Sequence, residues 1–271
     1  MAYQARPAAV VATLLAGSAV VTGQLAFEVA SVRPNTSGPG RTFMRRLPGV
    51  GFEAGNVTPR DLILFAYDIQ RPYLIGLPGW AENERFDIVA RAGGVAQTLP
   101  AGGNVEWLML RKLLEDRFKL TAHAETREMQ VYALVMARRD GRLGPQLRRS
   151  QVDCTSTPPA PPAANGGGQP QCSRRNGPGF TAAVGQPISA FLFFLVGQVQ
   201  RAVIDRTGLT GTWDIELTFS TDGTAAPATT PQDSGPSLFT ALQEQLGLRL
   251  EPSIGPVQVL VIDRIERPTE N

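Results

Sequence analysis

The stretch Gly51-Phe52-Glu53-Ala54, which Pro59 follows, returns as Gly179-Phe180-Thr181-Ala182, which Pro187 follows. The offset between the two is 128 residues (179 − 51 = 128). In both copies a short strand-like segment leads to a proline, the residue favoured at the first position of a helix. Self-similarity at a fixed spacing indicates a repeated structural unit. The sequence therefore predicts a fold that is built twice.

Three further blocks recur in the same order. Phe86-Asp87-Ile88 matches Trp213-Asp214-Ile215 at an offset of 127 residues (214 − 87 = 127). A helical apolar pattern and a strand-like one recur at similar offsets: Leu110, Leu114, Phe118 and Leu120 match Leu238, Leu242, Leu246 and Leu248, and Val131, Leu134, Val135 and Met136 match Val257, Leu260, Val261 and Ile262. Because four blocks keep one order at nearly one offset, we expect an internal duplication.

Local signals predict the order β-α-β-α-β in each half. The first helix begins after Thr58, its expected N-cap, with Asp61 at the third position. The second begins after Asn104 and has an apolar stripe of Leu110, Leu113, Leu114 and Phe118. In the second half, Gln186-Pro187 and Ser237 open the two helices. The expected strands are 27–33, 86–92, 130–137, 212–219 and 257–265, with a hairpin of 41–47 and 51–54.

These elements predict an α+β protein of two repeated halves, 24–140 and 179–271, related by a pseudo-two-fold axis. A Pro/Gly-rich linker at 141–178 joins them, and its composition predicts mobility. A second Pro/Gly-rich stretch, 221–236, interrupts the second half. The pattern leaves open whether the halves form two domains or share one sheet.

The N-terminus predicts export. Arg6 precedes an apolar run from Ala8 to Val21, and small residues follow up to Gly23, which is the order of a secretory signal peptide at 1–23. The other strongly apolar stretch, 188–199, is too short to cross a bilayer, so we expect a buried helix there and no transmembrane span after cleavage. The expected location is periplasmic or extracellular.

Cys154 and Cys172 flank a Pro/Gly-rich segment that cannot form a core. In an oxidising compartment this spacing predicts a disulfide that closes the base of a loop. Such a cross-link is worth about 3 kcal/mol in the chain-entropy description. A redox-active pair is the alternative, but the sequence has no Cys-x-x-Cys arrangement to tune a thiolate.

Composition excludes several function classes. The formal net charge is +2, too small for a general polyanion binder, so nucleic acid is not expected as a partner. One His and two Cys cannot build a closed zinc site or an iron–sulfur cluster within one chain. The sequence therefore predicts no metal and no cofactor.

Two carboxylate arrangements are candidates for catalysis. Asp87 and Asp214 are equivalent in the proposed duplication, and two carboxylates brought together across an axis could share a proton. Alternation along a strand would place His123 and Glu125 on one face, as a histidine–carboxylate pair requires. For all four residues a surface strand position is the simpler interpretation, and no Gly-x-Ser-x-Gly motif indicates a serine hydrolase.

Binding is the better-supported chemistry. Trp80 and Trp213 follow matching Gly-rich turns, and exposed aromatic rings there could line a groove that holds a peptide or glycan. With their charged neighbours they form the set of candidate binding residues: Trp80, Arg85, Asp87, Trp213 and Asp214. The sequence predicts no catalytic residue.

These motifs also resemble a known family. The chain is similar to the soil-associated DUF3738-type family of Acidobacteria and relatives over almost all of the predicted mature sequence. The resemblance rests on 26–34, Gly79-Trp80, Glu84-Arg85-Phe86-Asp87-Ile88, 114–120, 125–128, 131–134, 203–211, 238–248 and 261–263. It implies an exported domain of unknown function without assigned catalytic residues. Similar modules are joined to membrane metallopeptidases that resemble antibiotic sensors, which implies an envelope sensing or ligand-binding role.

The leading hypothesis is a non-enzymatic exported protein that binds a peptide, a glycan or an envelope protein. One alternative is a hydrolase that uses Asp87 with Asp214, or His123 with Glu125. Another is an adhesion protein whose linker spaces two binding modules.

Overall fold

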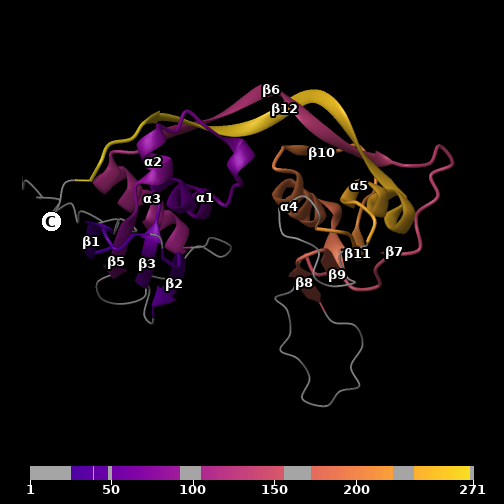
Figure 1. Cartoon of the computed structure of the whole chain (residues 1–271), viewed down its shortest axis with the longest axis horizontal. Coiled ribbons are helices and arrows are strands. Elements are labelled where there is room, and N and C mark those ends of the chain that lie inside the picture. The colour runs from indigo at the N-terminus through magenta and orange to yellow at the C-terminus, as the bar shows by residue number, and fades with distance from the viewer. Residues whose placement is uncertain are drawn as a thin grey trace, which may run out of the picture.

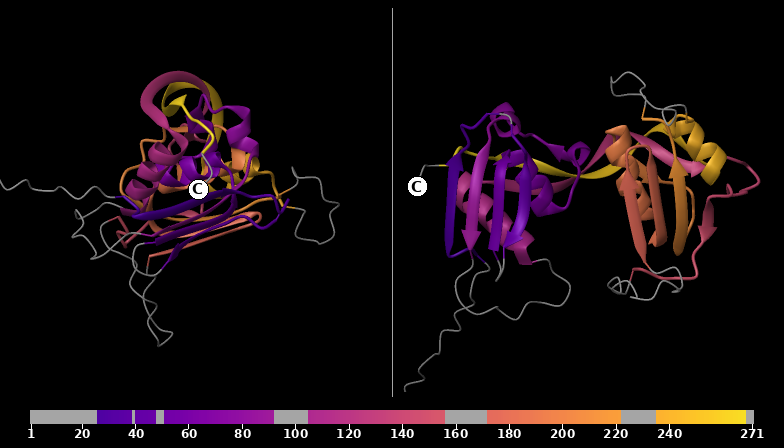
Figure 2. Two further views of the ribbon diagram at one scale, coloured as in Figure 1. Left: turned by 90° about the vertical axis from the view of Figure 1, so that its left-hand side faces the viewer. Right: turned by 60° about the horizontal axis from the view of Figure 1, so that its bottom comes forward.

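The computed structural model describes residues 26–38, 40–47, 51–91, 105–155, 172–221 and 235–268. Over these ranges helices and strands mix as predicted for an α+β protein, with two sheet-and-helix lobes joined by a long two-stranded ribbon (Figure 1). The helices of both lobes lie on the same side of their sheets as the ribbon (Figure 2). The expected signal peptide at 1–23 lies outside the described residues.

The first lobe has an antiparallel sheet in the order β1-β5-β3-β2. Its strands are β1 (Val29–Pro34), β2 (Phe43–Leu47), β3 (Gly51–Val57) and β5 (Phe86–Arg91). Its helical segments are α1 (Pro59–Tyr67), the 3-10 turn η1 (Arg71–Tyr73), α2 (Gly79–Asn83) and α3 (Val105–Phe118). The hairpin predicted for 41–47 with 51–54 is confirmed by the β2–β3 pairing.

The second lobe has an antiparallel sheet in the order β7-β11-β9-β8. Its strands are β7 (Leu147–Arg149), β8 (Ser173–Gly177), β9 (Phe180–Pro187) and β11 (Thr212–Thr218). Its helices are α4 (Ile188–Val199) and α5 (Leu238–Ala241), which continues as the π-helical turn η3 (Leu242–Leu246). The linker prediction differs from the structure at both ends, because β7 and β8 fall within 141–178 and pair with this sheet. Residues 156–171 of that segment lie outside the described ranges.

The ribbon consists of β6 (Thr121–Met136) and β12 (Leu248–Arg264), which pair antiparallel along nearly their whole length. A short parallel strand joins each side: β10 (Val203–Asp205) beside β6 and β4 (Leu74–Ile75) beside β12. Each long strand contributes to both cores. In β6, Ala122 packs against the core of the first lobe and Leu134 is buried in that of the second. In β12, Ile262 is buried in the first and Leu250 in the second. The halves therefore have separate sheets and also share one.

The predicted helix starts are confirmed where the structure describes them. Thr58 and Asp61 form a reciprocal capping box, in which each side chain accepts a hydrogen bond from the other residue's backbone N–H. The Ser237 hydroxyl accepts from the Thr240 N–H, and Pro187 is the N-cap of α4. The α3 stripe is fully or almost fully buried. Asn104 lies outside the described residues.

The strand register differs by one residue from the sequence match. Ala54 pairs with Ile88 in the first sheet, and Ala183 pairs with Ile215 in the second. Ala183 therefore occupies the position in the second sheet that Ala54 occupies in the first, whereas the sequence match assigns that position to Ala182. A one-residue shift turns a strand's side chains to the other face. Phe52 is accordingly 1% exposed and Phe180 39% exposed, although the two align in the sequence.

Candidate functional site

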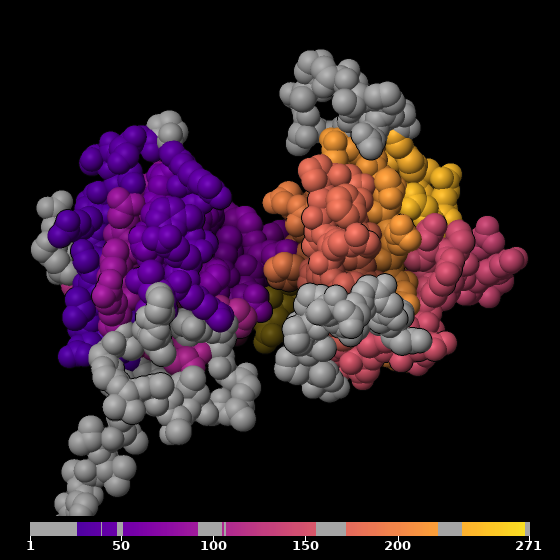
Figure 3. All heavy atoms as spheres, turned by 90° about the horizontal axis from the view of Figure 1, so that it is seen from below, coloured from indigo at the N-terminus to yellow at the C-terminus, as the bar shows by residue number. Residues whose placement is uncertain are grey.

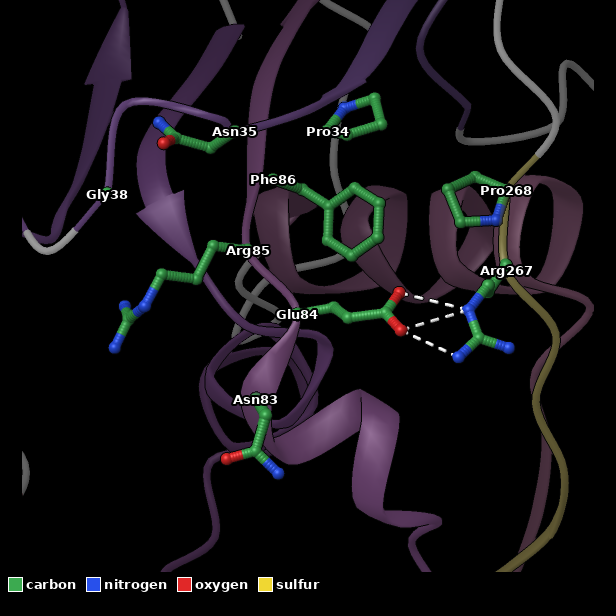
Figure 4. A pocket seen from close by; sticks show the side chains of 9 residues that line it. All are labelled: Pro34, Asn35, Gly38, Asn83, Glu84, Arg85, Phe86, Arg267 and Pro268. Atoms are coloured by element: carbon green, nitrogen blue, oxygen red, sulfur yellow. Dashed lines mark hydrogen bonds and ion pairs between the residues drawn. The ribbon is translucent and has the colours of Figure 1, made fainter.

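A groove of about 530 Å³ opens at one end of the first lobe, where β5 begins (Figure 4). The loop after β1 forms one wall, the α2–β5 junction forms the floor, and the segment after β12 forms the other wall. Its lining residues are Pro34, Asn35, Gly38, Asn83, Glu84, Arg85, Phe86, Arg267 and Pro268. Of the candidate binding residues, Arg85 lines the groove. Trp80 and Asp87 lie beside it, because Trp80 contacts the lining residue Arg267 and Asp87 contacts the lining residue Asn35.

Arg267 is held firmly in the wall by two partners. Its Nε lies 3.0 Å from both carboxylate oxygens of Glu84, and its Nη2 lies 2.6 Å from Oε1. Its guanidinium carbon lies 5.0 Å from the centre of the Trp80 ring, within cation–π range. The hydrogen bonds to Arg267 hold the pKa of the Glu84 carboxyl below its usual value. Within the described residues the Arg267 Nη1 has no hydrogen-bond partner, so it is available to a ligand.

Asp87 stabilises the strand beside it. Gly55 and Asn56 together oppose Asp87, which makes a β-bulge in β3. The Asp87 carboxylate accepts the Asn56 N–H at 2.9 Å, and it also accepts from the Asn35 amide at 2.8 and 3.0 Å. Asn56 has a φ of 56°, a left-handed conformation that this bond helps to hold. Asp87 therefore fixes the groove wall and does not point into the groove as a free acid.

Arg85 is exposed, and residues of the β2–β3 hairpin region hold its guanidinium on the side of Glu84 away from Arg267. Its Nη1 donates to the Asn56 carbonyl at 2.8 Å and to the Thr42 hydroxyl at 3.4 Å. Among the described residues its remaining N–H groups have no partner. In Figure 4 its guanidinium and that of Arg267 lie on opposite sides of Glu84. The groove thus offers cationic N–H donors around the apolar rings of Pro34, Phe86 and Pro268.

The structure does not bring Asp87 and Asp214 together. Asp214 lies in the second lobe, where it accepts the Gly185 N–H at 3.0 Å. Val184 and Gly185 oppose it as a bulge in β9, so it repeats the bond that Asp87 makes. Each carboxylate serves its own bulge, and a shared proton has no geometric basis.

Trp213 differs from the expectation of a groove-lining ring. It is 5% exposed and packs in the core of the second lobe, with the Arg149 guanidinium 5.6 Å from its ring centre. The reason is strand alternation: Trp213, Ile215 and Leu217 all face inward, while Asp214 faces the other way. Trp80, in contrast, is partly exposed beside the groove.

His123 and Glu125 lie on one face of β6, as alternation predicts, with 3.5 Å between Nε2 and Oε2. The sequence did not indicate the closer partner, Asp263 of β12, whose carboxylate lies 2.9 Å from Nδ1. The hydrogen bond to Asp263 raises the pKa of His123, and the Glu125 carboxylate adds to this effect. No hydroxyl or thiol nucleophile is bonded to this histidine among the described residues, so the cluster is a surface ion-pair network across the ribbon.

The disulfide prediction is confirmed. Cys154 and Cys172 are bonded, with their Cα atoms 5.6 Å apart. The Cys154 N–H donates to the Gly185 carbonyl at 3.1 Å, so the bridge lies against the bulge that Asp214 caps.

Sequence reasoning missed half of the groove. Arg267 and Glu84 are 183 residues apart, and neither belongs to a local motif that would indicate the pairing. Only the return of β12 to the first lobe brings them together. A charged residue just beyond an apolar strand is too common to serve as a signal.

The comparisons with known proteins give one match. A family model described as "Protein of unknown function (DUF3738)" matches residues 60–265. The matched range includes Trp80, Glu84 and Arg85, whereas the 26–34 motif and Arg267 lie outside it. Neither the search of curated proteins nor the search of solved structures found a match. Among the described residues, no helix is long and apolar enough to cross a membrane.

Proposed function

This chain belongs to the DUF3738 family, and we propose that it is a non-enzymatic binding module of the cell envelope whose groove holds a ligand carrying a carboxylate. The observation that supports the proposal most strongly is the fixed position of Arg267. Its guanidinium is oriented by Glu84 and Trp80 before any ligand arrives, while Nη1 stays available. A pre-oriented donor loses little conformational freedom on binding.

The charges of the groove favour an anionic group. Glu84 is neutralised by Arg267, which leaves the positive charge of Arg85 unbalanced within the lining. Guanidinium groups bind carboxylates through charge-assisted, often bidentate hydrogen bonds. Pro34, Phe86 and Pro268 add apolar surface for the rest of the ligand. Envelope peptides and acidic glycans both carry carboxylates, so both remain ligand candidates.

The proposal is tested by calorimetric titration of residues 24–271 with two probes, an N-acetylated Ala-Pro-Glu peptide and a glucuronic acid disaccharide. Each has a neutral counterpart, the N-acetylated Ala-Pro-Gln amide or the glucose disaccharide. We expect a carboxylate probe to bind and its neutral counterpart to bind at least tenfold more weakly. The probe that binds identifies the ligand as peptide or glycan. A carboxylate site would be refuted if charged and neutral probes bind with equal affinity, or if no probe binds.

Variants locate the binding. Arg267→Gln removes a charge-assisted donor worth roughly 1.5–3 kcal/mol, or about 10- to 150-fold in Kd. Arg85→Gln is the second variant, because it leaves the Trp80–Glu84–Arg267 cluster intact. Arg91→Gln, at the opposite end of β5, is the matched control and should bind as the unaltered protein does. Unchanged affinity in both groove variants would place the binding elsewhere.

We also propose that the two halves arose by duplication about a pseudo-two-fold axis. The matching strand orders and the paired bonds from Asp87 and Asp214 to their bulges support this idea. Export to the periplasm or beyond is supported by the disulfide and by the signal-like N-terminus. Mass spectrometry of the cellular protein tests it, and we expect the chain to begin near residue 24.

A further inference from the structure

The edge strands β2 and β8 face each other across the space between the lobes (Figures 1 and 2). Among the strands that the structure describes, β2 pairs only with β3 in the first sheet, and β8 pairs only with β9 in the second. Figure 3 shows the surface notched between the two lobes. Within the described ranges, each edge strand has one row of backbone N–H and C=O groups without a neighbouring strand, which is a template for pairing with another chain.

Both edges carry two adjacent arginines. These are Arg45-Arg46 on β2 and Arg174-Arg175 on β8, and all four side chains are exposed. Arg45 forms an ion pair with Glu53. Within the described ranges neither Arg174 nor Arg175 has an ion-pair partner. The β8 edge therefore has the stronger unbalanced positive charge of the two edges.

The hairpin geometry shows which backbone groups of β8 are open. Pro178 and Gly179 form a two-residue turn between the paired residues Gly177 and Phe180. Because hydrogen-bonded and non-hydrogen-bonded pairs alternate from this closing pair, the N–H and C=O of Arg174 and Asn176 point away from β9. The side chains of Arg174 and Arg175 project from opposite faces of the sheet. A strand added here would meet a cation on each face.

We propose that β8 is the docking edge for an acidic, extended segment of a protein partner, which adds to the second sheet as a further strand in the space between the lobes. Backbone pairing at Arg174 and Asn176 would hold the segment. Acidic side chains at alternate positions share one face of the sheet, so they would meet Arg174 or Arg175 according to the register of the added strand. The arginines disfavour a second copy of this chain as the occupant, since two β8 edges would bring like charges together. This surface is independent of the groove, which lies in the first lobe on the segment after β12.

The test uses fluorescence anisotropy with the full mature chain and a labelled peptide of alternating Val and Glu. Two reference peptides have the same length: one alternates Val and Lys, and the other is the Val–Glu peptide with every backbone amide N-methylated. The methylated peptide keeps the negative charge but cannot donate backbone hydrogen bonds. We expect the Val–Glu peptide to bind at least tenfold more tightly than either reference.

Three variants separate the contributions. Arg174→Gln with Arg175→Gln should weaken Val–Glu binding by about tenfold or more, because the charge-assisted contact is lost on whichever face the glutamates occupy. Arg174→Pro removes an open N–H without removing a bond to β9, and it should weaken binding while the thermal midpoint stays unchanged. Arg139→Gln, an exposed arginine outside both edges, is the control and should leave binding unchanged.

Two results would overturn the proposal. Equal binding of the Val–Glu peptide and its N-methylated form would show an unspecific polyanion surface, of the kind an acidic glycan would also occupy. Unchanged binding by the Arg174/Arg175 double variant would show that β8 is not the docking edge.

Discussion

Replacing Asp87 by alanine should destabilise the first lobe, whatever ligand the protein binds. The carboxylate accepts one backbone and two amide contacts: the Asn56 N–H at 2.9 Å and the Asn35 amide at 2.8 and 3.0 Å. Asn56 is 5% exposed, so water cannot readily replace the lost partner. Its left-handed φ of 56° also loses the bond that helps to hold it.

The magnitude follows from these contacts. Leaving a buried N–H without an acceptor costs about 1–3 kcal/mol, and the exposed Asn35 contacts add about 0.5 kcal/mol. We expect Asp87→Ala to lower the free energy of unfolding by about 1.5–3.5 kcal/mol, and the Tm by roughly 3–14 °C. Asp214→Ala should cost about 1–2 kcal/mol, because Asp214 accepts only the Gly185 N–H among the described contacts.

Urea denaturation followed by far-UV circular dichroism measures the difference. Asp87→Asn is the matched control, because an amide oxygen can still accept the Asn56 N–H, and it should cost less than about 1 kcal/mol. Equal stability of the alanine variant and the unaltered protein would refute the bulge-holding role. A catalytic role predicts the opposite pattern, in which the asparagine variant folds normally and loses an activity.

Three other predictions concern the ribbon and the disulfide. Leu134→Ala should lower the free energy of unfolding by about 2–5 kcal/mol in urea denaturation, because its side chain is fully buried in the second lobe. Replacing Cys154 and Cys172 by serine should cost about 3 kcal/mol in the same assay. The ion pair of His123 with Asp263 raises the folded-state pKa of His123, so its stabilisation is complete below the histidine's ordinary pKa and is lost as the pH rises through the raised value. NMR titration of this single histidine should show a lower pKa in Asp263→Asn, and equal pKa values would contradict the pairing.

The sequence predicts elements that local chemistry determines. The α1 start is an example, because Thr58, Pro59 and Asp61 satisfy the first backbone donors of the helix within four residues. The short strands β4 and β10 were missed because each is held by a parallel neighbour far away in the chain. Two or three residues show no alternation from which a strand could be predicted.

The register shift shows the limit of matching letters. Gly51-Phe52 and Gly179-Phe180 align in sequence, yet pairing to β5 and β11 places Ala54 opposite Ile88 and Ala183 opposite Ile215. The β2–β3 and β8–β9 hairpins differ in length by one residue, because Leu47 pairs with Gly51 whereas Gly177 pairs with Phe180. Matching residues in the sequence does not reveal this difference. The helix caps do, because Thr58 and Pro187, 129 residues apart (187 − 58 = 129), occupy the same N-cap position.

The crossing of the two long strands explains both the missed half of the ribbon and the missed half of the groove. The predicted strand begins at 130, and for residues 121–129 strand alternation predicts only that His123 and Glu125 lie on one face. This part of β6 pairs with β12, a partner more than 100 residues away in the chain, which local alternation does not reveal. By crossing back, β12 buries Ile262 in the first lobe and places Arg267 against Glu84 and Trp80. The groove therefore contains residues from both halves of the chain. A single half, folded alone, would lack the guanidinium on which the proposed ligand binding depends.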